Sequence, residues 1–125
     1  MAKLYVAEPD SAVAERLLRS DPVWSTAAHT EVEVRRVLSL RVAAGNLAAV
    51  KSDFARDWDR LAVIALDDTT CKLAADLAET TGARTLDALH LAAAGRAGAP
   101  VVRLVTFDAR LAQVARSLGW SVVGT

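Results

Sequence analysis

The chain has 125 residues, of which 53% are hydrophobic, and its formal net charge at pH 7 is zero. This length predicts one domain, residues 1–125, that can bury a core of its own. A dedicated nucleic-acid coat protein would be basic, so zero charge speaks against that class. An enzyme that binds RNA through a local basic rim around an acidic site remains open.

The sequence predicts a cytoplasmic protein. No apolar run approaches the ~18 residues that a membrane span requires. The start of the chain has no apolar segment typical of a signal peptide. The single cysteine, Cys71, cannot form an internal disulfide, and without a partner at metal-ligand spacing it is expected in the core.

Hydrophobic periodicity predicts helices that alternate with short apolar strands. In chain order the expected elements are a helix over 10–20, a strand over 23–27, helices over 30–44 and 47–60 separated by Gly45 and Asn46, a strand over 61–67, helices over 69–81 and 85–98, a strand over 101–108, a helix over 109–119 and a strand over 120–124. Continuously apolar strands are typical of buried parallel sheets. The fold class is therefore predicted as α/β, a three-layer α/β/α sandwich with a mostly parallel central sheet.

Functional crevices in such folds lie beyond the carboxyl ends of the strands, and acidic residues gather there. Asp108 ends the run VVRLVTFD, and Thr106, two residues earlier, points to the same side of an extended strand. Asp67 and Asp68 end LAVIALD and are expected to cap the next helix. For Asp108, the sequence is equally consistent with a helix-capping role and with a functional role.

Two more acidic residues are candidates. Asp87 starts the helix TLDALHLAAA, which is apolar on nearly every face, so its carboxylate needs a partner or a metal ion. Glu33 lies early in its helix and could pair with a following arginine. His90, one turn after Asp87, is expected to be a core residue rather than a ligand.

Carboxylate oxygens that converge on one crevice suit Mg²⁺ or Mn²⁺ better than zinc. Such ions serve phosphoryl transfer and phosphodiester hydrolysis. The sequence contains no glycine-rich phosphate loop, no GxSxG motif and no CxxC pair that would indicate another chemistry.

Four segments resemble the PIN-domain ribonucleases, specifically the VapC toxins of VapBC toxin–antitoxin modules. They are KLYVAEPDS near the start, TEVEVRRVL, TLDALHLAAA, which is the most diagnostic, and LVTFDARLAQVA. Their order and spacing agree with this family from Lys3 almost to the end of the chain.

The resemblance implies a metal-dependent endoribonuclease, a hydrolase of RNA phosphodiester bonds. It implies Glu33, Asp87 and Asp108 as ligands of Mg²⁺ or Mn²⁺, and Thr106 as the hydroxyl that hydrogen-bonds a ligand or a metal-bound water. The implied partners are RNA, a cognate VapB-like antitoxin and a second copy in a homodimer, with no membrane. Antitoxin recognition would involve an arginine that reaches the acidic site.

The sequence departs from the family pattern at its start. VapC toxins begin with an apolar strand that ends in a catalytic Asp, whereas Met1 and Ala2 stand here just before the KLY helix. We therefore expect the first strand and the first Asp to be missing and the activity to be impaired. The alternative is an impaired PIN-fold module that dimerises or binds antitoxin without cleaving RNA. A third possibility is an unrelated phosphatase-like α/β domain.

Overall fold

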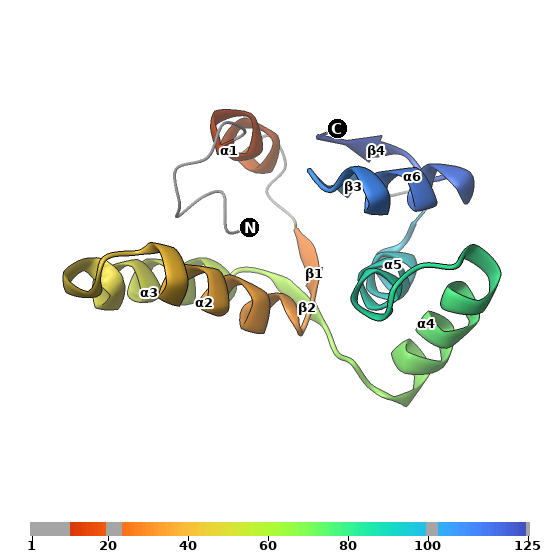
Figure 1. The fold of residues 1–125 in the computed structure, drawn as a ribbon, viewed down its shortest axis with the longest axis horizontal. Coiled ribbons are helices and arrows are strands. Elements are labelled where there is room, and N and C mark those ends of the chain that lie inside the picture. The colour runs from red at the N-terminus through yellow and green to blue at the C-terminus, as the bar shows by residue number, and fades with distance from the viewer. Residues whose placement is uncertain (1–10, 20–23, 100–102, 125) are drawn as a thin grey trace. The chain divides into compact units, whose positions relative to one another are not determined.

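The computed structural model describes residues 11–19, 24–99 and 103–124, without the side chains of residues 17 and 18. The elements are α1 (Ser11–Arg19), β1 (Ser25–Ala27), α2 (Thr30–Arg41), α3 (Ala44–Trp58), β2 (Ala62–Ile64), α4 (Asp68–Thr81), α5 (Thr85–Ala97), β3 (Leu104–Val105), α6 (Ala109–Ser117) and β4 (Val122–Val123) (Figure 1). The expected order of helices and strands is confirmed. The KLY segment of the expected first motif lies outside the described residues.

The α/β class is confirmed, but the single central sheet is not seen within the described residues. The strands form two two-stranded sheets, β1 with β2 and β3 with β4. β3 and β4 are parallel, as predicted, with Leu104 opposite Val122. The apolar run over 61–67 becomes a strand only at Ala62–Ile64, so few backbone groups are available to extend a sheet.

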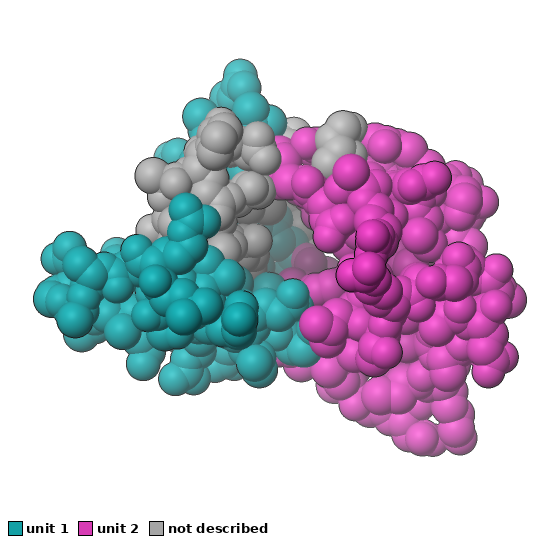
Figure 2. All heavy atoms as spheres, in the orientation of Figure 1, with its two compact units in different colours: residues 1–24, 29–62 teal, residues 25–28, 63–125 magenta. Residues whose placement is uncertain are grey.

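The chain divides into two compact units, and each is described by itself (Figure 2). Unit 1 comprises Met1–Trp24 and His29–Ala62, and unit 2 comprises Ser25–Ala28 and Val63–Thr125. Within the described ranges, no helix has the length and apolar character needed to cross a membrane.

In unit 1, α2 and α3 form a helical hairpin around the buried residues Val34, Leu38 and Phe54. The predicted break at Gly45 and Asn46 is wrong, since both residues lie in the first turn of α3. α2 ends at Arg41 because Val42 is extended, with φ −93° and ψ 134°. Val42 packs against the hairpin core, and burying this side chain favours the earlier turn.

In unit 2, small residues bring α4 and α5 together. Ala74 of α4 packs with Ala88 and Ala92 of α5, and all three are buried. A second cluster joins α5 to α6 through Leu91, Leu111 and Ala115, with β3 and β4 packed against it. α5 is therefore held on two sides, which fixes the position of its first turn.

Candidate metal centre

Asp108 lies at the N-cap of α6, and one of its two carboxylate oxygens is used there. Oδ1 accepts hydrogen bonds from the backbone N–H groups of Arg110 at 2.9 Å and Leu111 at 3.2 Å. Oδ2 has no hydrogen-bond or ion-pair partner among the residues that the structure describes. The capping role is thus confirmed, and it leaves an exposed oxygen that can bind a ligand.

The Thr106 side chain is hydrogen-bonded to the backbone of Asp108. The Asp108 N–H donates to Thr106 Oγ1 at 3.1 Å. The Thr106 N–H in turn donates to the Val123 carbonyl at 3.1 Å, continuing the pairing of β3 with β4. The structure therefore brings Thr106 and Asp108 together, although both lie just beyond the end of β3. This chain of bonds fixes the direction in which the Asp108 carboxylate leaves the backbone.

Asp87 lies in the first turn of α5 and is half-buried. In the described part of the chain its carboxylate makes no hydrogen bond and no ion pair. The helix does not use it as a cap, because the N-cap is Arg84, which has no side-chain capping bond. Thr85 is the first residue of the helix. A half-buried carboxylate without a partner is costly, so Asp87 suits an external cation.

Asp87 and Asp108 each lie about one turn from a shared hydrophobic cluster. Leu91 is four residues after Asp87, so the two side chains are on one face of α5. Leu111 is three residues after Asp108, and its N–H bonds to Asp108 Oδ1. Leu91 and Leu111 belong to the same buried cluster. The packing of unit 2 therefore places the two carboxylates at the starts of two helices that share a core.

Glu33 lies in unit 1, on α2. Its Oε1 is 3.4 Å from Nε2 of His29, the N-cap residue of this helix, and the contact is an ion pair when the histidine is protonated. Arg35 pairs with Glu31 at 3.4 Å. The expected ligand set of Glu33, Asp87 and Asp108 draws on both units, and it stays a prediction.

Asp67 has the structural role that the sequence predicted. It caps α4 and accepts from the Thr70 N–H at 2.9 Å, and Arg96 Nη1 lies 2.9 Å from Oδ1 and 3.1 Å from Oδ2. The Thr70 N–H, then the Thr70 hydroxyl, then the Arg96 guanidinium lower the pKa of the Asp67 carboxyl below its ordinary value. Asp68 pairs with Lys72 at 2.9 Å. Both carboxylate oxygens of Asp67 therefore have partners within the protein, in contrast to those of Asp108.

The sequence reasoning missed Thr70 and Arg96, which complete this network. The Thr70 side chain is fully buried, and its hydroxyl accepts from Arg96 Nη1 at 2.7 Å. The spacing Asp-x-x-Thr was a usable signal for Thr70, whereas nothing in the sequence links Arg96 to a residue 29 positions away. The prediction that Cys71 lies in the core is wrong. It is exposed because the adjacent Thr70 occupies the buried face of α4.

The donor set fits a hard divalent cation. Asp108 Oδ2 and the Asp87 carboxylate are oxygen donors without protein partners among the described residues, and carboxylate oxygens are what Mg²⁺ and Mn²⁺ prefer. His90, on the same helix as Asp87, is half-buried, and its expected role as a core residue stays a prediction.

Sequence comparison relates this chain to known ribonucleases. Residues 2–117 match the PIN domain family. Ribonuclease VapC35 of Mycobacterium tuberculosis (strain ATCC 25618 / H37Rv) is 39% identical over 107 residues, which cover 84% of this chain and 75% of that protein. Ribonuclease VapC46 of the same strain is 33% identical over 123 residues, covering 98% of this chain and 90% of that protein. The chain therefore belongs to the PIN-domain family and is a relative of the VapC ribonucleases.

Proposed function

We propose that this protein is a metal-dependent endoribonuclease, the VapC-like toxin of a type II toxin–antitoxin system, in which both units make up one PIN domain. The observation that carries the proposal is the pair of open carboxylates in unit 2. Among the described residues, Asp108 Oδ2 has no partner while Oδ1 caps its helix, and the Asp87 carboxylate has no partner either. Family membership supports the reaction class.

Each residue has a proposed role. Asp87, Asp108 and Glu33 hold Mg²⁺ or Mn²⁺. The ion, when bound, lowers the pKa of water and neutralises charge that develops on the phosphate. The Thr106 hydroxyl oxygen orients Asp108 by accepting a hydrogen bond from the Asp108 backbone N–H, and the hydroxyl proton remains able to be donated to a metal ligand. The hydrophobic cluster shared by Leu91 and Leu111 fixes the two helices that carry Asp87 and Asp108 relative to each other.

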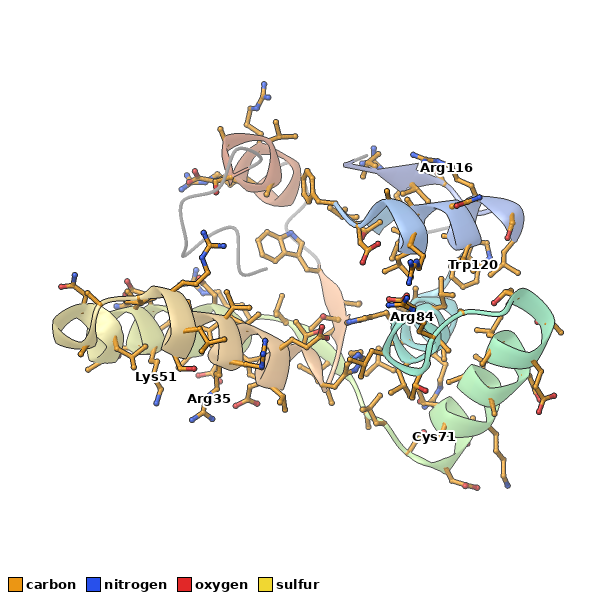
Figure 3. The ribbon with its side chains drawn as sticks, in the orientation of Figure 1. Arg35, Lys51, Cys71, Arg84, Arg116 and Trp120 are labelled. Atoms are coloured by element: carbon orange, nitrogen blue, oxygen red, sulfur yellow. The ribbon has the colours of Figure 1, made fainter. Side chains whose placement is uncertain are left out.

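The proposed partners are RNA as substrate, a VapB-like antitoxin as inhibitor and a second copy in a homodimer, all in the cytoplasm. A groove of about 250 Å³ on the α2–α3 hairpin supports antitoxin docking. Its lining combines the aromatic side chains of Phe54 and Trp58 with two basic and two acidic residues, Arg35, Lys51, Glu31 and Asp59. Figure 3 labels Arg35 and Lys51 on this hairpin. An arginine of the antitoxin can neutralise the open carboxylates in place of the metal ion.

A ribonuclease assay tests the proposal. We expect the chain to cleave RNA when Mg²⁺ or Mn²⁺ is present, to stop when EDTA is added, and to lose cleavage in Asp87→Ala. The matched control is Asp76→Ala, the same change at an exposed position of α4, which should cleave normally.

The outcomes also separate the alternatives. Absence of cleavage by a folded chain that still binds antitoxin would favour the impaired binding module. Turnover of a small phosphate ester but not of RNA would favour the phosphatase-like domain.

A further inference from the structure

We propose that Arg84 and Arg110 form an RNA-binding pair that flanks the open carboxylates and holds the phosphates next to the one that is cleaved. This inference rests on the proposed ribonuclease function and adds the residues that position its substrate. The two arginines lie in unit 2, at the starts of the helices that carry Asp87 and Asp108.

Charge is distributed unevenly along the chain. Residues 83–125 contain five arginines and only two acidic residues, Asp87 and Asp108, so their net charge is +3. The whole chain has zero net charge, and the rest of it therefore carries −3. The two acidic side chains of this basic segment are the ones that are proposed to hold the metal ion. A binding site for a polyanion around an acidic metal centre requires such a distribution.

The ion pairs of unit 2 single out a subset of these arginines. Arg96 forms an ion pair with Asp67. Outside residues 83–125, Lys72 forms an ion pair with Asp68. Arg84 and Arg110, like Arg103, are exposed and form no ion pair with any carboxylate that the structure describes in unit 2. Their guanidinium groups are therefore available to an anion from outside the protein.

Both arginines are tied to the metal-binding aspartates by local geometry. Arg84 is the N-cap of α5, three residues before Asp87, which places the two on neighbouring positions of the first turn. Arg110 donates its own backbone N–H to Asp108 Oδ1 at 2.9 Å, so its Cα is fixed relative to that carboxylate. Figure 3 labels Arg84 beside α5.

RNA is the ligand that this arrangement fits. A phosphodiester chain presents one negative charge per nucleotide, so a phosphate at the metal ion is followed on both sides by further phosphates. Guanidinium groups bind phosphate oxygens in a bidentate manner. Without such cations, the carboxylates would repel the RNA from the metal centre.

The salt dependence of RNA binding tests the pair. The probe is a fluorescein-labelled single-stranded RNA, and its anisotropy is followed with EDTA present so that no cleavage occurs. The variants are Arg84→Gln, Arg110→Gln and the double variant. The slope of log K against log salt is negative, and each lost phosphate contact should reduce its magnitude by roughly 0.7. The double variant should reduce the magnitude by about 1.4.

Arg103→Gln is the matched control. Arg103 is exposed and belongs to the same unit, but it precedes β3, whereas Asp108 follows it. We expect this variant to keep the slope of the unmodified chain. In cleavage assays, the double variant should raise KM and leave kcat nearly unchanged, since the arginines hold the substrate and do not touch the reacting atoms.

Two results would overturn the inference. One is an equal loss of slope in Arg103→Gln, and the other is competition by polyglutamate as strong as that by polyuridylate at equal charge, which would indicate a general anion surface. Failure of the proposed function would look different: the unmodified chain would bind RNA with the predicted salt slope but cleave none with Mg²⁺ or Mn²⁺.

Discussion

The starts of α4 and α6 show how the same local motif can have opposite roles. Asp67 and Asp108 each follow a strand, and each caps the next helix with Oδ1. At the start of α4, Arg96 contacts both oxygens of Asp67. At the start of α6, Asp108 Oδ2 has no partner among the described residues. Both oxygens of the Asp67 carboxylate have partners within the protein, whereas Asp108 has one oxygen that can bind a ligand.

The difference teaches that a capping role does not argue against a functional one. A carboxylate has two oxygens, and a cap uses one of them. What decides the role is whether a cation from elsewhere in the chain takes the other. For Asp67 that cation comes from the last turn of α5.

Asp108→Asn should give the largest effect. The amide keeps an oxygen for the helix cap but loses the charge that binds the metal ion, so kcat should fall by at least about 100-fold, the upper range seen even for loss of outer-sphere partners of metal ligands. Asp67→Asn should retain activity. Cleavage rates under saturating Mn²⁺ measure both, and equal losses in the two variants would remove the contrast between the helix starts.

Leu91→Ala should destabilise unit 2 by about 2–5 kcal/mol, because it leaves a cavity in the cluster shared by α5 and α6. The side chain of Leu91 is fully buried. Leu86→Ala on the same helix is the control, since Leu86 is 53% exposed and should change stability by less than about 0.5 kcal/mol. Urea unfolding measures both, and similar midpoints would contradict the described core.

Asp67→Asn should change how stability depends on pH. The pKa of the Asp67 carboxyl is lowered in the folded state, so its contribution is fully present above the unfolded pKa of about 4. It is lost as pH falls through the lower folded pKa. The difference in unfolding free energy between the unmodified chain and the variant should be constant near neutrality and shrink below about pH 4. A difference that grows on acidification would contradict the network.

Lys72→Gln should give the smallest effect, about 0–0.5 kcal/mol. It breaks the pair with Asp68 at the start of α4, whose side chains are 77% and 82% exposed, so water screens most of the attraction. Arg96→Gln removes the ion pair with Asp67 and should lower the free energy of unfolding by more than Lys72→Gln does. Thermal melts of the two variants rank the contributions, and the reverse order would show that the network does little for stability.

Much of this molecule could be predicted from its sequence. Apolar periodicity located the helices, and LAVIALD and VVRLVTFD located two of the strands, because burial imposes these patterns directly. Strand ends and a buried helix also drew attention to the carboxylates of Asp108 and Asp87, whose role as metal ligands stays a prediction.

The remainder depends on contacts that are distant in the chain. The break at Val42 rather than at Gly45 follows from packing against the hairpin core, which overrode the local preference of glycine. Cys71 was expected in the core, but the packing of α4 against α5 determines which face of α4 is buried. The closure of Asp67 by Arg96 required the pairing of two helices, which no local pattern encodes.

Binding of Mn²⁺ measures the central contrast most directly. Calorimetric titration of the unmodified chain, Asp87→Asn, Asp108→Asn and Asp67→Asn would compare the open and the closed carboxylates without any need for turnover. We predict that the unmodified chain and Asp67→Asn bind Mn²⁺ alike, and that Asp87→Asn and Asp108→Asn bind at least about tenfold more weakly. Equal affinity in all four proteins, or a loss confined to Asp67→Asn, would contradict a metal centre at the starts of α5 and α6.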